Sequence, residues 1–281
     1  MPEPPVSAEA FVQSVERVVR HRGHGPVVVK LGGSAMEDPA ATEACLRSIA
    51  TLNQLGIQIV LVHGGGKPID RAMSEAGLVP KKVAGRRYTD EATLRIVVKV
   101  LKSIGDELAE KLTVLGCPAR RISDSLQGKR LKVKDENGER IDLGAVGEVT
   151  KYRPAKQGIV PVIPSIARDR EDNWLNVNAD TAASAVAGAM QADKAIFLTD
   201  TPGVLRDRHD PGSLIPKLTE QECRAFIVSG VINGGMVPKV EACFEALAAG
   251  AKSALILDGR EPFSLLGVFL HDSFSGTEIT R

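Results

Sequence analysis

Short runs of apolar residues recur along the chain, and segments with helical periodicity lie between them. The runs are rich in Val, Ile and Leu and cover residues 27–31, 57–62, 159–163, 195–199 and 254–257. Continuous apolar runs of this length are typical of strands that are buried on both faces, as in parallel sheets. They predict a sheet whose two faces are both covered.

The segments between these runs carry start and stop signals of helices. Asp38-Pro39 predicts a helix that runs to about Leu55, and residues 89–115 keep apolar side chains at a helical spacing. Thr219 to Glu222 has the form of a capping box, and Gly250 closes a helix over 236–249. This alternation predicts an α/β fold: a three-layer α/β/α sandwich around a central, mainly parallel sheet.

The middle of the chain has a different pattern. Residues 127–152 read as short alternating strands with a turn at 135–138, which predicts a β-hairpin over the first half of the sheet. A polar turn at 169–174 suggests a boundary between lobes. We therefore expect an N-terminal extension at 1–25, a first lobe at 26–170 and a second at 171–281, sharing one continuous sheet.

The N-terminal extension is predicted to be an amphipathic helix. Its polar side chains face away from an apolar stripe that consists of Ala8, Phe11, Val12, Val15, Val18 and Val19. Such a stripe requires a partner surface. The sequence leaves open whether it packs on its own domain or on another subunit.

Composition and charge exclude several classes of protein. The 281 residues include 36 Lys+Arg and 35 Asp+Glu, so the net charge is +1 and gives no bulk attraction for nucleic acid or an anionic membrane. No apolar run approaches the ~20 residues that span a bilayer, and the acidic, proline-rich start is unlike a signal peptide, so a cytoplasmic protein is expected. The four cysteines form no CxxC pair, so we expect small buried side chains and no metal site.

The glycines indicate a candidate binding site, because two glycine clusters follow consecutive predicted strands. Gly32-Gly33 comes directly after Lys30-Leu31, and Gly64 to Gly66 follows His63. Glycine lets backbone N–H groups approach an anion closely, and the carboxyl ends of parallel strands are where open α/β sheets bind ligands. Neither cluster is a GxGxxG fingerprint or a P-loop, which disfavours a Rossmann oxidoreductase and a Walker-type ATPase.

Two later motifs add charged and polar side chains. In the segment 176–180, Asn176 and Asn178 share a face of a strand, and Asp180 lies where a small-residue helix begins. In isolation, Asp180 could equally be a helix N-cap. Gly234-Gly235 opens another helix with Lys239 in its first turns, where the helix dipole disfavours a cation unless an anion is bound.

Six motifs, at 28–34, 63–66, 85–89, 176–180, 198–205 and 234–239, occur in the order and at the spacing of the amino acid kinase family. The chain resembles this family from about residue 27 to residue 279. The resemblance is strongest to members that phosphorylate the side-chain carboxylate of N-acetyl-L-glutamate, the second step of arginine biosynthesis. It implies ATP as co-substrate, Mg²⁺ as cofactor and a homo-oligomer, with arginine as a candidate effector.

The resemblance also implies roles for individual residues. Lys30 and Lys239 would stabilise the transferred phosphoryl group, and Asp180 would orient both lysines. Gly65, Gly66, Arg87 and Asn176 would bind the acyl substrate in the first lobe. The nucleotide would lie against Gly32, Gly33, Asp200, Thr201, Pro202, Gly203, Val204, Leu205, Val231, Ile232 and Asn233.

Alternatives stay open at this point. Residues 121–125 depart from the family's glycine-rich segment, so the acceptor could be another acyl amino acid such as N-acetyl-2-aminoadipate. Carbamate, glutamate, uridylate and aspartate kinases share the fold, the last being least expected because no regulatory domain follows Arg281. A catalytically silent arginine sensor is the rival from another class, and Gly267 stands where the resemblance leads us to expect an effector-binding glutamate. The N-terminal extension resembles the helix through which arginine-regulated members interlace dimers into hexamers, so the expected homo-oligomer is a dimer, or a hexamer formed through this helix.

Overall fold

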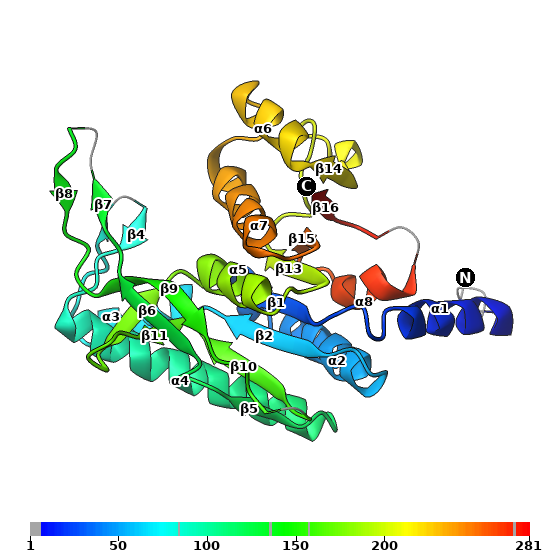
Figure 1. The fold of residues 1–281 in the computed structure, drawn as a ribbon, viewed down its shortest axis with the longest axis horizontal. Helices are drawn as coiled ribbons and strands as arrows, with labels where there is room; N and C mark the ends of the chain where they lie inside the picture. Colours follow the sequence, from blue (N-terminus) through cyan, green and yellow to red (C-terminus); the bar gives the residue numbers. More distant parts are fainter. Residues whose placement is uncertain (1–6, 84, 135–136, 157, 272–273) are drawn as a thin grey trace.

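The computed structural model describes residues 7–83, 85–134, 137–156, 158–271 and 274–281. Its centre is a sheet of eight strands, coloured from blue to red across the middle of Figure 1. They are β1 (Val27–Leu31), β2 (Ile59–His63), β5 (Ala119–Arg121), β10 (Val160–Pro164), β13 (Lys194–Thr199), β14 (Lys217–Thr219), β15 (Ser253–Asp258) and β16 (Thr277–Thr280). The order is β14-β16-β15-β13-β1-β2-β10-β5, and only β15 and β16 pair antiparallel, so the predicted mainly parallel sheet is confirmed.

Helices cover both faces of this sheet. The core on one face includes side chains of α2 (Pro39–Gln54), α4 (Glu91–Val114) and α8 (Ser264–Leu270), and the core on the other includes those of α5 (Ala179–Ala189) and α7 (Val237–Ala249). Along β1, alternate side chains enter the two cores: Val27 and Val29 enter one, and Val28 enters the other. The three-layer sandwich predicted from the sequence is therefore present.

Local signals explain where the helices begin and end. The Asp38 side chain caps α2, Thr219 and Glu222 form the capping box of α6 (Glu220–Val228), and Gly250 ends α7 with φ +126°. The N-cap of α5 differs from the alternative considered for Asp180. The Asn178 side chain accepts hydrogen bonds from the amides of Asp180 and Thr181, so the Asp180 carboxylate is not used as the cap.

The middle segment forms more than the predicted hairpin. β6 (Leu126–Arg130), β9 (Val146–Tyr152), β11 (Ile166–Arg168) and β12 (Trp174–Val177) close into a small barrel, from which β7 (Val133–Lys134) and β8 (Arg140–Ile141) project as a hairpin (Figure 1). Residues 135 and 136 of the expected turn lie outside the described residues. The polar turn after β11 joins two strands of this barrel, and the division into two lobes stays a prediction.

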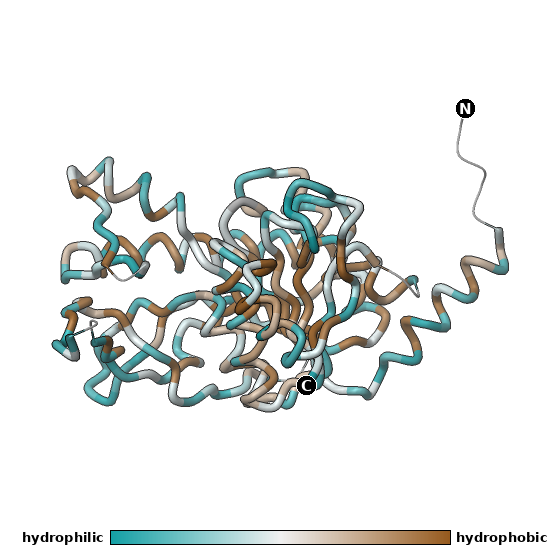
Figure 2. The backbone as a smooth tube through the Cα atoms, turned by 90° about the horizontal axis from the view of Figure 1, so that it is seen from above, coloured by the Kyte–Doolittle hydropathy of each residue, from teal (hydrophilic) through white to brown (hydrophobic). Residues whose placement is uncertain are grey.

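Helix α1 (Ala8–Arg20) extends from the body of the molecule (Figure 2). Val18 is fully buried and α1 contacts α8, but Phe11 and Val12 are 64% and 52% exposed. Of the predicted apolar stripe, this chain therefore covers Val18 fully and Val15 in part, and it leaves Phe11, Val12 and Val19 exposed.

The four cysteines are free and buried, as expected, and burial raises the pKa of Cys45 to about 12. Within the described ranges, no helix is both long and apolar enough to cross a bilayer.

Candidate active site

The two glycine clusters meet at the carboxyl edge of the sheet. β1 and β2 pair in parallel with Leu31 opposite His63, and the Gly64 amide donates to the Leu31 carbonyl at 3.1 Å. Gly65 is the N-cap of α3 (Gly66–Glu75), so this helix begins at the second cluster. A cavity of about 280 Å³ opens at this edge. The positive end of α3 and the backbone amides of the loops make the cavity suited to an anion.

This first cavity gathers predicted residues from distant parts of the chain. It is lined by both predicted glycine pairs, by Lys30 and Asp180, and by the predicted substrate residues Arg87 and Asn176. Gly32 and Gly33, which we predicted at the nucleotide, line this cavity as well. They lie next to Lys30, which lines the same cavity.

Lys30 is held at the edge of the cavity by Asp180. Its Nζ lies 2.9 Å from Asp180 Oδ1, and only 13% of the lysine side chain is exposed. A Cβ at position 32 would lie 2.5 Å from the same Nζ, so the glycine is required for this conformation of the lysine. Asp180 therefore positions the ammonium group, and Gly32 leaves the space that this position needs.

Arg87, on β4 (Arg86–Arg87), reaches across to α3. Its Nη1 lies 2.5 Å from Asp70 Oδ1, and its Nη2 donates to the Gly66 carbonyl at 3.3 Å. The strand pairs with β3 (Lys82–Val83) as a short hairpin above the cavity. A guanidinium group presents five N–H donors, so Arg87 can hold Asp70 and still bind a carboxylate.

Asn176 joins the barrel to the start of α4. Its Nδ2 donates to Thr89 Oγ1 at 3.0 Å, and the Thr89 hydroxyl donates to the Arg87 carbonyl at 2.9 Å. The two predicted substrate residues are thus connected through Thr89.

A second cavity of about 500 Å³ lies over the C-terminal half of the sheet. Asp200 and Lys239 both line this cavity, and Lys239 lies in the first turn of α7. The predicted nucleotide residues that line it are Asp200, Thr201, Pro202, Gly203, Val204, Leu205, Val231, Ile232 and Asn233. The structure therefore brings all the predicted residues from the second half of the chain, apart from Asn176 and Asp180, into one cavity.

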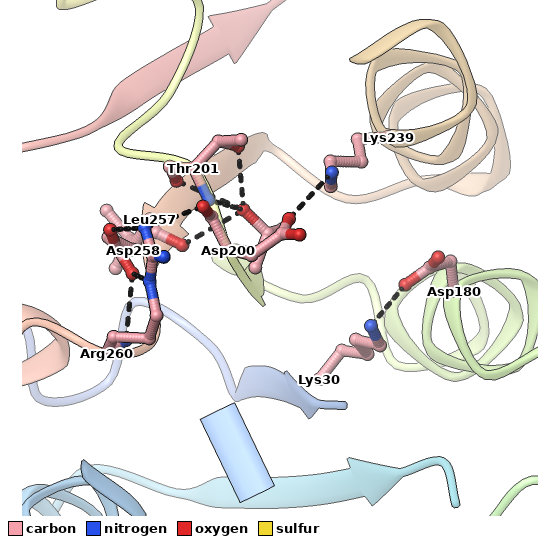
Figure 3. Close-up of polar contacts among 9 residues, drawn as sticks. Lys30, Asp180, Asp200, Thr201, Lys239, Leu257, Asp258 and Arg260 are labelled. Carbon is pink, nitrogen blue, oxygen red and sulfur yellow. Dashed lines mark hydrogen bonds and ion pairs between the residues drawn. The ribbon is translucent and has the colours of Figure 1, made fainter. Parts of the chain in front are cut away.

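Lys239 is paired with Asp200. The two charged atoms are 3.0 Å apart, and the hydrogen bond from Lys239 lowers the pKa of the Asp200 carboxyl group. Figure 3 shows this pair facing the Lys30–Asp180 pair from a different part of the fold. Asp180 was predicted to orient both lysines. In the structure it forms an ion pair with Lys30, whereas the ion pair of Lys239 is with Asp200.

Arg260 stabilises the loop that carries Asp200. It donates to the Asp200 carbonyl at 2.7 Å and to Asp258 Oδ2 at 2.7 Å, and these bonds are visible in Figure 3. Thr199 Oγ1 accepts from the Thr201 amide at 3.2 Å. The loop that carries Asp200 is consequently fixed to the ends of β13 and β15.

His63, the last residue of β2, is a buried neutral imidazole directly before the Gly64 to Gly66 cluster. Its side chain is fully inaccessible, and desolvation lowers its pKa to about 4. Nδ1 lies 3.1 Å from the Gly64 carbonyl, so the proton must be on Nδ1 for this hydrogen bond to form. The side chain thereby holds the first peptide of the glycine loop.

Sequence reasoning missed several residues of the site. Asp70, Lys82, Arg86 and Ser165 contribute to the first cavity or to Arg87, and Arg208 lines the second. Arg86 adjoins the predicted Arg87 and could have been considered. Asp70 carried no comparable signal, because its role depends on how α3 packs beside β4.

Comparison with known proteins identifies related sequences. Residues 25–258 match the model of the amino acid kinase family. The chain is 40% identical over 269 residues to an acetylglutamate kinase of Methanothrix thermoacetophila, covering 91% of this chain and 92% of the relative. It is also 40% identical over 272 residues to an acetylglutamate kinase of Methanothermobacter thermautotrophicus, covering 91% and 93%.

Solved structures share the fold. N-acetylglutamate synthase from Neisseria gonorrhoeae, complexed with coenzyme A and N-acetyl-glutamate, superposes with a TM-score of 0.83 at 23% identity. The match covers 97% of this chain and 63% of the synthase chain. Carbamate kinase from Giardia lamblia bound to AMP-PNP gives a TM-score of 0.65 at 16% identity, with coverage of 92% and 98%.

Proposed function

The chain belongs to the amino acid kinase family, and from this membership we infer that it transfers the γ-phosphoryl group of ATP to the side-chain carboxylate of N-acetyl-L-glutamate. The chain is an enzyme, an ATP-dependent kinase with a carboxyl group as acceptor. Its products are N-acetylglutamyl 5-phosphate and ADP, which places it in arginine biosynthesis. The observation that carries the proposal is the pair of cavities with Lys30 in one and Lys239 in the other.

The chemistry of the reaction agrees with the residues present. A carboxylate acceptor with a pKa of ~4 is ionised at neutral pH, so no general base is needed. Phosphoryl transfer then requires alignment and positive charge on the transferred group. Lys30 and Lys239 would supply that charge, Asp180 would hold Lys30 in place, and Arg87, Asn176, Gly65 and Gly66 would hold the acceptor.

The donor set also fits Mg²⁺ that enters with the nucleotide. Mg²⁺ is usually bound by one or two carboxylates plus phosphate oxygens and water. Asp180 and Asp200 are the carboxylates at the two cavities, and among the described residues no cluster of three metal-ligating side chains lies in either. When bound, the ion would neutralise charge on the phosphates, and Asp180 and Asp200 are the residues that would hold it.

The position of residues 121–125, which depart from the family's glycine-rich segment, favours N-acetylglutamate over N-acetyl-2-aminoadipate as the acceptor. Arg121 donates to Asp106 at 2.7 Å and to the Ser123 hydroxyl, and none of residues 121–125 lines the first cavity. The segment that raised the alternative is therefore engaged in contacts outside the acceptor site. The silent-sensor alternative is disfavoured because Lys30, Asp180 and Lys239 are all retained at the cavities.

We further propose a homo-oligomer in which the exposed apolar stripe of α1 contacts another subunit. Phe11, Val12 and Val19 are 64%, 52% and 41% exposed, which supports a partner surface beyond this chain. Arginine stays a candidate effector, although Gly267 on α8 offers no carboxylate.

ADP release with Mg-ATP tests the function across a panel of acceptors: N-acetylglutamate, N-acetyl-2-aminoadipate, aspartate, glutamate and carbamate, each with and without arginine. We expect the highest kcat/KM for N-acetylglutamate. A higher value for another acceptor would reassign the substrate, and turnover on none would support the silent sensor.

A further inference from the structure

Two histidines and an aspartate meet at the edge of the sheet opposite both cavities. His21 is the C-cap of α1, His24 follows three residues later, and Asp193 lies in the turn that precedes β13. One ligand atom from each residue, an imidazole nitrogen of each histidine and a carboxylate oxygen of Asp193, lies within 4.8 Å of the other two. Imidazole and carboxylate together form a ligand set that suits Zn²⁺ and similar ions.

His21 presents a nitrogen with no other use. Its Nδ1 is buried and has no hydrogen-bond partner among the described residues, and it lies 3.9 Å from Asp193 Oδ2. Zinc bonds to nitrogen and oxygen are about 2.1 Å long, so two ligands of one ion are roughly 3.4 Å apart in a tetrahedral site. Small side-chain rotations would bring these donors into that geometry.

The surroundings keep the His21 ring oriented and neutral. The ring packs edge-on against Phe269, with centroids 5.1 Å apart, and against His24 at 5.6 Å. Burial, with a further contribution from Lys194, lowers its pKa, and a neutral imidazole is the form that binds a metal. Lys194 itself pairs with Glu278 at 3.3 Å and does not occupy Asp193.

A lysine occupies the remaining side of the carboxylate. Lys252 Nζ lies 3.5 Å from Asp193 Oδ1 and donates to the His24 carbonyl at 2.5 Å. Its side chain is 60% exposed, so it can leave for solvent at little cost. Lys252 and a metal ion would therefore compete for Asp193. Removal of the Lys252 charge should then strengthen metal binding, an effect not expected of histidines elsewhere on the surface.

We propose that His21, His24 and Asp193 form a binding site for a divalent transition-metal ion, with Zn²⁺ the best match, and that water completes the coordination. The bound ion would join the end of α1 to the turn before β13. It would be separate from the Mg²⁺ that accompanies ATP, because the cluster lies at the amino ends of β1 and β13 while both cavities lie at the carboxyl ends.

The test uses the full chain, free of any affinity tag and treated with chelator, in buffer without nucleotide. Zn²⁺ is titrated by calorimetry, and Co²⁺ by the visible absorption that reports tetrahedral coordination. We expect one ion per chain. His21→Ala, His24→Ala and Asp193→Asn should each weaken binding at least 10-fold, and Lys252→Met should tighten it several-fold.

His209→Ala is the matched control, because His209 is exposed and distant from the cluster in sequence and fold. It should bind the ion as the parent does. Circular dichroism checks that each variant is folded, and Asp193→Asn, which keeps the shape of the side chain, covers the case in which His21→Ala loosens α1. Absence of binding, binding unchanged in all three ligand variants, or weaker binding in Lys252→Met would overturn the proposal.

Discussion

At the scale of single residues, Lys239 gives the clearest test of the proposed mechanism. Lys239→Met removes a charge that would act mainly on the transition state, so kcat should fall roughly 10²-fold or more while the KM for the acyl acceptor changes little. Steady-state kinetics at saturating Mg-ATP measure both. Lys217→Met is the matched control, because the Lys217 side chain is 79% exposed and lies outside both cavities. An unchanged kcat in Lys239→Met would reject the role.

Arg87 should affect binding of the acceptor instead. Its side chain is only 12% exposed, and its guanidinium is already oriented by Asp70 and the Gly66 carbonyl, so it is preorganised for a carboxylate. Arg87→Ala should raise the KM for the acyl acceptor roughly 10-fold or more, with a smaller effect on kcat. Arg95→Ala, which removes an exposed arginine paired with Glu91, should leave KM as it was. A normal KM in Arg87→Ala would rule out this role.

His63 predicts a pH dependence of stability. Its pKa is about 4 in the folded chain and 6.5 when unfolded, so between these values the unfolded state binds the extra proton. The free energy of unfolding should therefore fall by roughly 3 kcal/mol from this group as the pH is lowered from 6.5 to 4. Urea unfolding at several pH values measures the slope. His63→Asn should flatten it and His209→Gln should not, whereas equal slopes in all three proteins would contradict the assignment.

At the scale of elements, the sequence predicted what depends on local chemistry. Strand and helix positions followed from apolar runs and from caps such as Asp38 and Thr219, and the structure moves their ends by only a few residues. The barrel was not predicted because β11 and β12 pair with strands far away in the chain. The Lys239–Asp200 pair was missed for the same reason, since it depends on how the start of α7 is placed above β13.

Close packing of α5 against α7 makes a prediction that belongs to this scale. A Cβ at Gly188 would lie 2.2 Å from the Ala249 Cβ, so the two helices approach as closely as they do only because of this glycine. Gly188→Ala should destabilise the protein by about 1–3 kcal/mol, although alanine is intrinsically the better helix former.

The control is a glycine in another helix. At Gly267 the nearest contact of an added Cβ is 3.9 Å, so Gly267→Ala should be neutral or stabilise by up to about 1 kcal/mol. Thermal and urea unfolding measure both variants. Equal effects of the two substitutions would show that helix propensity, and not the contact between α5 and α7, decides the outcome.

At the scale of the whole molecule, the net charge is nearly zero although positive side chains are concentrated in one place. The net charge is only +1, yet Lys30, Arg87 and Lys239 are all placed at the carboxyl edge of one sheet. Each is held by a carboxylate, Asp180, Asp70 or Asp200, which keeps the cation in place until an anionic ligand arrives. The net charge of the chain therefore says little about its ligands. The three ion pairs at the cavities instead indicate where two anionic ligands would bind.

The exposed stripe on α1 predicts the state of assembly. If another subunit covers Phe11 and Val12, then Phe11→Glu would bury a charge at the contact, and deletion of residues 1–23 would remove the contact altogether. Both changes should lower the number of chains per oligomer, which is the mass measured by light scattering after size-exclusion chromatography divided by the mass of one chain. Gln13→Glu, which adds the same charge on the polar side of α1, should leave the mass unchanged. Because both cavities lie at the opposite edge of the sheet, kcat with N-acetylglutamate should be retained in all three variants. An unchanged number of chains per oligomer in the deletion variant would show that α1 does not connect subunits.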